Sequence, residues 1–207
     1  MKEKNYEKLL RINTEGYQQG FHKSLHYHRY EPTPYEDLVA LFSSYSLKNS
    51  DHVVDFGCGK GRLNFFIHHL FQATVTGVEF NESYYEDALK NRINYSSKRP
   101  HSFEKIHFQL CKAEEYEIAS LDNRFYFFNP FSIQIFIKII NNILHSLEKN
   151  KRHAEIILYY PSDEYCLYLD NHPSFSFKQE ILLGKTKKQQ RNRFLIYHYL
   201  TDSNILT

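Results

Sequence analysis

The chain has 207 residues, enough to bury a sizeable core, and this length favours one domain. Its formal net charge is only +2, so no global field attracts nucleic acid or a membrane surface. No apolar run reaches the roughly 20 residues that cross a bilayer, and the polar N-terminus lacks the apolar stretch of a signal peptide.

The cysteine and histidine patterns argue against disulfides and metals. The three cysteines are widely scattered and form no C-x-x-C pair, so we expect a reduced, cytoplasmic setting. His26 and His28 lie close together, but no third ligand is placed nearby, so we predict no metal site. We expect residues 1–30 to form an N-terminal extension and residues 31–207 a single domain, in a monomer or a homodimer.

The first well-marked helix begins near residue 33. Thr33-Pro34-Tyr35-Glu36 has the pattern of a capping box with proline at the first helical position. This pattern predicts a helix that continues through Leu38 and Leu41.

A strand, a glycine turn and a helix follow. The apolar run 52–56, with Asp55 near its end, predicts a buried parallel strand. Gly57, Gly59 and Gly61 come next, and apolar residues then recur at helical spacing from Leu63 to Leu70. In open α/β sheets, ligands bind at the carboxyl ends of the strands, and glycine lets a ligand approach the backbone there. The N–H groups at the helix start suit an anionic group.

The spacing of the glycines separates two kinds of cofactor site. The dinucleotide fingerprint G-x-G-x-x-G would need glycine at position 62, where this chain has Arg62. The turn instead follows apolar-apolar-acid-apolar-Gly-x-Gly-x-Gly, and at these positions it resembles the first motif of class I S-adenosylmethionine-dependent methyltransferases. The resemblance implies S-adenosylmethionine as cofactor. It also implies an α/β fold with a doubly wound, mostly parallel seven-stranded sheet, helices on both faces and a C-terminal antiparallel strand pair.

Later segments fit that architecture. Apolar or aromatic runs predict further strands, and the last two are joined by a polar hairpin. These runs are 74–78, 106–111, 124–128, 154–160, 175–183 and 193–200. The hairpin 184–193 is basic; it is either a solvated edge loop or a contact for an anionic substrate or RNA phosphate.

The resemblance implies a cofactor site along the strand ends. Glu79 follows the second strand about 20 residues beyond the glycines, where such folds place a carboxylate for the ribose hydroxyls. A solvated strand-end acid is the alternative. Phe80 would flank the adenine, and Glu114 would contact it, since Lys112 stands at the usual acid position. The expected cofactor-binding residues are Tyr30, Thr33, Asp55, Gly57, Cys58, Gly59, Gly61, Glu79, Phe80, Ala113, Glu114 and Asn129.

The segment before the first strand has two interpretations. Many methyltransferases that this chain resembles cover the methionine end of the cofactor with this segment, which would make residues 1–30 a lid. Tyr30, Thr33 and Tyr35 are then the candidates for contact with the cofactor. The alternative is a packed aromatic loop without a binding role.

Asn129-Pro130-Phe131 resembles the (Asp/Asn)-Pro-Pro-(Tyr/Phe) motif of amino-directed methyltransferases, with one proline instead of two. An amide oxygen and a backbone carbonyl can orient an attacking amine, and a ring can pack on the substrate or beside the sulfonium. These three residues are therefore the catalytic candidates. Alternatively, Asn129-Pro130 only ends the strand and Ser132 caps the next helix. A hydroxyl acceptor would need a base, for which His28 and Tyr160 are the candidates.

These features together predict a methyltransferase whose acceptor is not identified. Nitrogen is favoured over oxygen through Asn129-Pro130-Phe131, and a protein, a small molecule and a nucleobase all remain open as partners. A non-catalytic binding module with the cofactor fold is one alternative. An NAD(P)-dependent oxidoreductase is another, disfavoured by Arg62.

Overall fold

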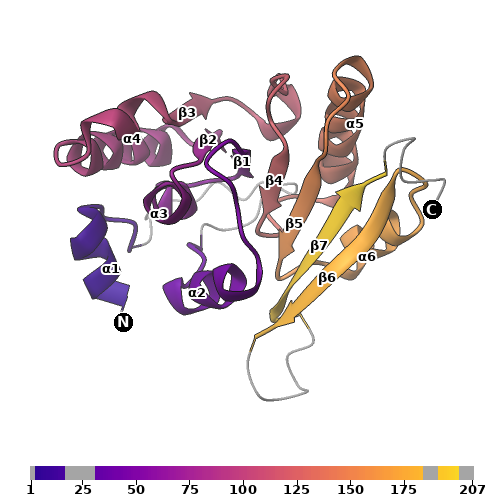
Figure 1. Ribbon diagram of the computed structural model, residues 1–207, viewed down its shortest axis with the longest axis horizontal. Coiled ribbons are helices and arrows are strands. Elements are labelled where there is room, and N and C mark those ends of the chain that lie inside the picture. Colours follow the sequence, from indigo (N-terminus) through magenta and orange to yellow (C-terminus); the bar gives the residue numbers. More distant parts are fainter. Residues whose placement is uncertain (1–2, 17–30, 184–190, 201–207) are drawn as a thin grey trace.

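Seven strands form one sheet in the order β3-β2-β1-β4-β5-β7-β6 (Figure 1). The computed structural model describes residues 3–16, 31–183 and 191–200. The strands are β1 (His52–Phe56), β2 (Thr74–Glu79), β3 (Ile106–Leu110), β4 (Arg124–Phe127), β5 (Glu155–Tyr159), β6 (Phe175–Leu182) and β7 (Arg193–Tyr199). The helices are α1 (Glu3–Leu10), α2 (Tyr35–Ser44), α3 (Arg62–Phe71), α4 (Glu82–Ser96), α5 (Ile133–Lys149) and α6 (Asp163–Asp170), with short 3-10 turns η1 (Pro100–Glu104) and η2 (Ala113–Glu115).

The strand directions confirm the expected architecture. Strands β1 to β5 are parallel, and β7 pairs in the antiparallel direction with both β5 and β6. The chain order reverses between β1 and β4, which lie side by side at the centre of the sheet. Ligands bind at such a switch point, beyond the carboxyl ends of the strands. The topology therefore makes the point where the glycine turn leaves β1 the candidate site.

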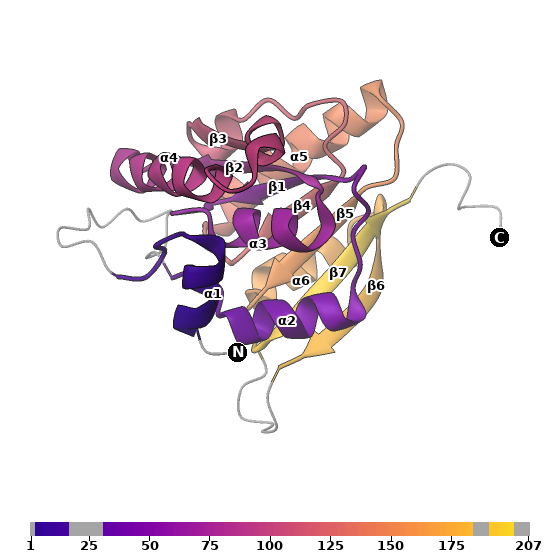
Figure 2. The ribbon, with the colours of Figure 1, turned by 60° about the vertical axis from the view of Figure 1, so that its left-hand side comes forward.

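Helices cover both faces of the sheet, as Figure 2 shows for α1, α2 and α3 in front and for α5 and α6 behind. One core lies under α1 to α4 and includes Phe65, Phe66 and Tyr95. The other lies under α5 and α6, where the Phe136 and Tyr165 rings stack at 3.8 Å between centroids. Since both faces are covered, the central strands β1 and β4 are mostly apolar and are buried beyond their first residue.

The start of α2 differs from the predicted capping box. The helix begins at Tyr35, and Pro34 occupies the N-cap position without a side-chain hydrogen bond. The Thr33 hydroxyl is instead 2.8 Å from the hydroxyl of Tyr126, on β4. The Thr33 side chain therefore makes a tertiary hydrogen bond instead of the local cap that the capping-box pattern predicts. By contrast, Asn81 caps α4 through a local contact, because its side chain accepts from the Tyr84 N–H at 3.2 Å.

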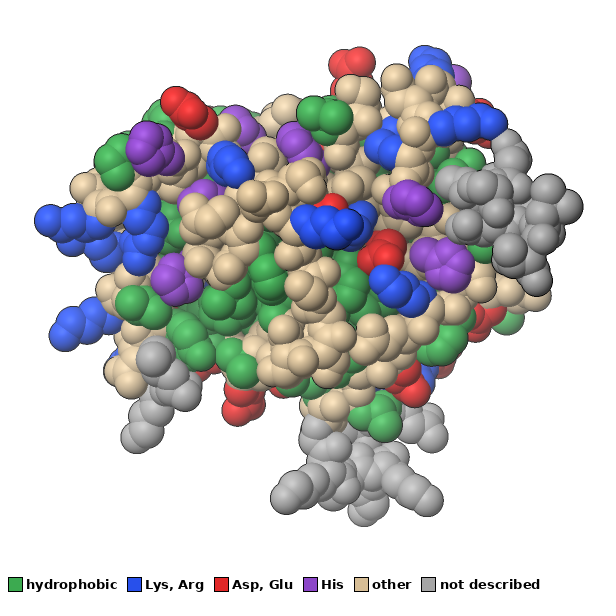
Figure 3. Space-filling view, in the orientation of Figure 1, with side chains coloured by type: hydrophobic (Ala, Val, Ile, Leu, Met, Phe, Trp, Pro, Cys, Tyr) green, Lys and Arg blue, Asp and Glu red, His purple; other side chains and the backbone are tan. Residues whose placement is uncertain are grey.

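The surface has no single dominant charge on the face drawn in Figure 3. Lysine and arginine side chains are scattered among acidic and histidine side chains there. The described residues thus form no continuous positive stripe on this face, which agrees with the small net charge. None of the helices in the described part of the chain is long and apolar enough to cross a bilayer.

Candidate active site at the strand ends

The glycine turn leaves β1 through a series of backbone hydrogen bonds. The N–H groups of Gly57 and Cys58 both donate to the carbonyl of Val78 on β2, at 2.9 and 3.1 Å. Gly57, Gly59 and Gly61 have φ angles of 79°, 53° and 84°, in the left-handed region that glycine adopts most easily. Gly61 is the N-cap residue of α3, so the turn delivers the chain directly into the helix.

Close contacts with neighbouring side chains explain why two of the three positions are occupied by glycine. A Cβ atom on Gly61 would lie 2.6 Å from Cζ of Phe108, a β3 residue. A Cβ atom on Gly57 would lie 3.0 Å from Cβ of Pro130. The sequence predicts that the glycines make room for a ligand. The structure shows that Gly57 and Gly61 also make room for the protein itself.

Glu79 holds the turn from the end of β2. Its Oε2 accepts from the Gly59 N–H at 2.9 Å, and its Oε1 accepts from the Asn81 N–H at 2.8 Å. Burial raises the pKa of the Glu79 carboxyl, and these backbone donors oppose that effect. A carboxylate has about four lone-pair sites, so it retains acceptor capacity for a ribose hydroxyl. The predicted ribose acid is therefore adjacent to the glycine turn and also fastens it.

Asp55 lies on the central strand, between Gly77 of β2 and Tyr126 of β4 in the register of the sheet. With its amide nitrogen toward Asp55, Asn64 donates to Oδ2 at 3.0 Å and accepts from the Gly77 N–H at 3.2 Å. Burial, and to a smaller extent the charge of Glu79, raise the pKa of Asp55 to about 8. Burial therefore raises the pKa of both acids near the turn, while backbone donors oppose the rise at Glu79.

This pKa predicts how Asp55→Asn changes stability. The unfolded carboxyl has a pKa near 3.8, so the folded protein holds more protons than the unfolded chain as the pH rises from about 4 to 8. Stability should therefore fall over this range in the native protein. We expect Asp55→Asn to raise the unfolding temperature, and by several degrees more at pH 9 than at pH 5, since roughly 2–4 °C corresponds to 1 kcal/mol at this chain length. Thermal unfolding of both proteins at the two pH values measures this, with Glu86→Gln on α4 as the control. A gain that is equal at both pH values would contradict the burial of a proton-binding carboxyl.

Arg62 is the main residue that the sequence interpretation missed. Its side chain is 5% exposed and donates to Thr14 Oγ1 at 2.7 Å, to Glu3 Oε2 at 2.6 Å and to the Thr33 carbonyl at 3.3 Å. It thus joins the first residue of α3 to α1 and to the segment before α2. The described part of the N-terminal extension, residues 3–16, is therefore fastened beside the glycine turn. The sequence feature that could have indicated this role is a basic residue directly after the last glycine of the turn.

The remaining cofactor candidates lie at the same edge of the sheet, as far as the structure describes them. Phe80 follows β2 and is 43% exposed, whereas Ala113 is buried in η2. The Glu114 carbonyl accepts from the side chain of Asn142 at 2.9 Å. Tyr30 and His28 lie outside the described residues. The site roles of all these residues stay predictions.

Asn129, Pro130 and Phe131 lie beside the glycine turn, at the end of β4. Asn129 has a φ of 40°, an uncommon conformation for a residue other than glycine. Pro130 packs against Gly57, and Phe131 is only 3% exposed, with its carbonyl accepting from the Tyr165 hydroxyl at 2.7 Å. The Phe131 ring therefore belongs to the core under α5, which leaves Asn129 and Pro130 as the half-buried members of the three.

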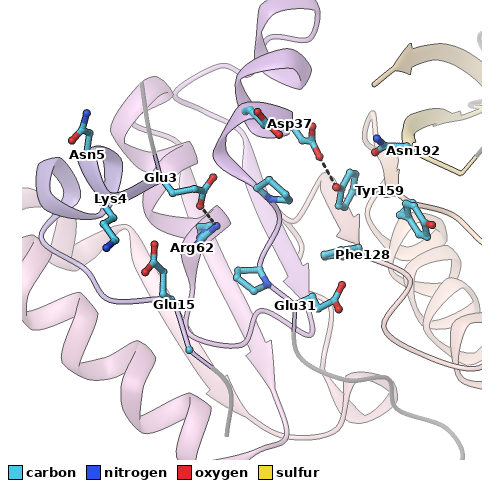
Figure 4. Close-up of a pocket in the computed structure, with 15 residues that line it drawn as sticks. Glu3, Lys4, Asn5, Glu15, Glu31, Asp37, Arg62, Phe128, Tyr159 and Asn192 are labelled. Carbon is cyan, nitrogen blue, oxygen red and sulfur yellow. Dashed lines mark hydrogen bonds and ion pairs between the residues drawn. The ribbon is translucent and has the colours of Figure 1, made fainter. Parts of the chain in front are cut away.

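A pocket of about 1410 Å³ lies next to these residues, between α1, α2 and the carboxyl ends of β4 and β5 (Figure 4). We call it the strand-end pocket; its lining includes Glu31, Asp37, Arg62, Phe128, Tyr159 and Tyr160. Within the described ranges, no group of three or more His, Cys, Asp or Glu side chains is arranged to hold a metal ion.

Comparison with solved structures shows the fold. The chain is similar to an rRNA methylase from Streptococcus thermophilus, with 16% identity, 82% of this chain and 96% of that chain covered, and a TM-score of 0.54. It is similar to a human methyltransferase 10 domain containing protein, with 12% identity, 95% and 92% coverage and a TM-score of 0.59. It is also similar to the precorrin-6y C5,15-methyltransferase of Geobacter metallireducens, with 14% identity, 82% and 89% coverage and a TM-score of 0.57.

A match to a family model shows which protein family the chain belongs to. No curated protein matches the chain. The model of a methyltransferase domain matches residues 47–167, more than half of the chain, from just before β1 into α6. The sheet order and the C-terminal antiparallel pair agree with the Rossmann-like fold of class I methyltransferases. The chain belongs to this methyltransferase domain family.

Proposed function

We propose that this protein binds S-adenosylmethionine along the carboxyl ends of β1, β2 and β3 and transfers its methyl group to a nitrogen atom. The observation that supports this most strongly is the hydrogen bond from the Gly59 N–H to Glu79, which brings a buried carboxylate to the glycine turn. Asp55 lies buried on the neighbouring strand. This pair of acids suits a ligand with ribose hydroxyls at one end and an ammonium group at the other.

Each residue then has a defined part in binding. Glu79 accepts hydrogen bonds from the ribose hydroxyls, and Asp55 orients the ammonium group directly or through water. Phe80 flanks the adenine, with Ala113 and Glu114 beyond it at the end of β3. S-adenosylmethionine supplies a methyl group activated by its bond to a cationic sulfur.

Asn129 orients the acceptor in this proposal. It directly follows Phe128 at the end of β4, and the neighbouring Pro130 packs on the glycine turn. Its amide oxygen and the following backbone carbonyl would accept hydrogen bonds from an amine and direct its lone pair. Holding two reactants in such a geometry can lower the barrier by about 7–11 kcal/mol.

Calorimetry and label transfer test the proposal. We expect S-adenosylmethionine and its demethylated product to bind, and methyl label to enter one fraction of a cell extract separated into protein, RNA and small molecules. Asn129→Ala and Asn129→Gly should both lower the turnover of that acceptor by about 100-fold, through the loss of a positioning contact, without changing cofactor affinity. The glycine variant accepts the φ of 40° freely, so equal losses would assign the effect to the side chain rather than to backbone strain.

Other outcomes identify the alternatives. Binding of NADH without binding of S-adenosylmethionine would support the oxidoreductase. Cofactor binding with no label transferred to any fraction would support the non-catalytic module. Unchanged turnover in both Asn129 variants would remove this residue from catalysis.

A further inference from the structure

The strand-end pocket has an acidic lining. Five carboxylates line its described part, against two basic side chains, Lys4 and Arg62. Arg62 is already paired, since it contacts Glu3 at 2.6 Å and Glu7 at 3.6 Å. The other lining carboxylates are Glu15, Glu31, Glu36 and Asp37. An anionic group in the described part of this pocket would meet an excess of like charge.

Aromatic rings form the wall nearest to the strand ends. Phe128 and Tyr159 lie with ring centroids 4.4 Å apart, and Tyr160 follows at 6.4 Å from Tyr159. The Tyr159 hydroxyl donates to Asp37 Oδ2 at 2.6 Å, which fixes its ring against α2 (Figure 4). Tyr160 is 40% exposed and has a φ of 49°, a strained conformation for a tyrosine. Aromatic faces combined with carboxylates attract organic cations, because the negative faces of the rings and the carboxylate charges act together.

The pocket wall includes the residue next to the position assigned to the reacting nitrogen. Phe128 lines the pocket, its ring lies 4.4 Å from the Tyr159 ring of the paired strand, and Asn129 directly follows it in the chain. Arg62, on the opposite side, directly follows the last glycine of the turn. An acceptor in the pocket would therefore extend one end toward Asn129 and the glycine turn.

We infer that the strand-end pocket is the acceptor site and that it takes an alkyl ammonium group, either on a lysine side chain of a polypeptide or on a free amine. This inference rests on the proposed methyl transfer. The ammonium group gives one proton to a pocket carboxylate or to water, and its nitrogen lone pair forms the new bond to the methyl carbon. The carbon–sulfur bond breaks with its electron pair remaining on sulfur, so the positive charge moves to the methylated nitrogen. The carboxylates of Glu31 and Asp37 line the same pocket and would stabilise that positive charge.

Nucleic acid is the macromolecule that this lining disfavours. Proteins bind phosphate backbones mainly through lysine and arginine side chains, whereas the described lining here is mostly acidic. The rRNA methylase that this chain resembles shares its fold at 16% identity, and a shared fold leaves the acceptor open. Methylation of RNA is therefore one of the outcomes that the experiment must distinguish.

The first experiment separates acceptor classes with the purified full chain and methyl-labelled cofactor. We expect label in N-methyl groups that survive acid hydrolysis, in the protein or the small-molecule fraction of a cell extract, and the labelled fraction identifies the source of the amine. Label in RNA or in base-labile esters overturns the inference, as does cofactor binding without transfer to an amine. Failure of the cofactor to bind in calorimetry overturns the proposed function instead.

The second experiment probes the pocket with n-butylamine, an analogue of the lysine side chain, and with n-butanol as the uncharged control. We expect n-butylamine alone to inhibit transfer competitively with the labelled acceptor. Glu31→Gln combined with Asp37→Asn should raise the KM of the acceptor and the inhibition constant of n-butylamine at least about tenfold, with cofactor affinity unchanged. The Asp37→Asn substitution keeps an amide oxygen that can accept from the Tyr159 hydroxyl, and Glu86→Gln on α4 is the matched control. Equal inhibition by the two probes, or an unchanged KM in the double variant, overturns the inference.

Discussion

Glu79→Gln is expected to weaken binding of S-adenosylmethionine by about 10- to 100-fold. The substitution removes the negative charge but keeps the size of the side chain and one acceptor oxygen. A hydrogen bond to a charged group contributes about 1.5–3 kcal/mol, and roughly 1.4 kcal/mol corresponds to tenfold in affinity. Because Glu79 accepts from the Gly59 N–H, the variant also loosens the turn that would receive the methionine portion. Isothermal titration calorimetry of both proteins measures the change.

Controls separate this effect from general damage. Glu86→Gln makes the same chemical change at another position of the chain, on α4, and should bind the cofactor as the native protein does. Thermal unfolding shows whether Glu79→Gln remains folded. If a folded Glu79→Gln variant binds with native affinity, the ribose assignment is wrong and Glu79 serves only to fasten the turn.

Gly61→Ala is expected to destabilise the protein by about 2–6 kcal/mol. Its φ of 84° costs a residue with a Cβ atom roughly 1–3 kcal/mol, and the new methyl group would lie 2.6 Å from the Phe108 ring, which adds about 1–3 kcal/mol of overpacking. Gly16→Ala is a matched control, since Gly16 has a φ of 91° and its Cβ would meet nothing within 4 Å. The difference between the two variants in lost unfolding free energy, measured by urea denaturation, therefore gives the cost of the steric clash with Phe108.

A second substitution keeps this test informative if Gly61→Ala does not fold. Adding Phe108→Leu removes the ring atoms nearest to the new methyl group and should restore part of the lost stability. A Gly61→Ala variant that loses no more stability than Gly16→Ala would show that the close packing between the turn and β3 is not a constraint.

The similar structures have different described activities, so the fold alone does not identify the acceptor. One is described as an rRNA methylase and another as a precorrin methyltransferase, on the same fold. The shared part is the sheet with its switch point, which positions a cofactor. The pocket wall of this chain comes from α1, α2 and the ends of β4 and β5. The acidic and aromatic lining of this chain is therefore the feature that we connect to its acceptor.

Features that depend only on neighbouring residues can be predicted from the amino-acid sequence. The strand, turn and helix around Asp55 and the three glycines follow from a contiguous pattern of apolar residues and glycines, and the structure confirms all three elements. The cap at Asn81 is equally local, because its partner is the N–H three residues later. The C-terminal strand pair was predicted from apolar runs together with the family resemblance, and the structure confirms it.

Contacts between distant segments could not be predicted from the sequence, because they depend on how the chain folds. The hydrogen bond from Gly59 to Glu79, the packing of Phe108 on Gly61 and the attachment of Arg62 to α1 all depend on which strands and helices lie side by side. The same holds for Thr33, whose hydroxyl bonds to Tyr126 rather than capping its own helix. A local pattern states what a side chain can do, but competition among partners in the folded chain determines which interaction it makes. The raised pKa of Asp55 and the acidic lining of the strand-end pocket also depend on the fold. Burial and the proximity of charges, which cause them, exist only after folding.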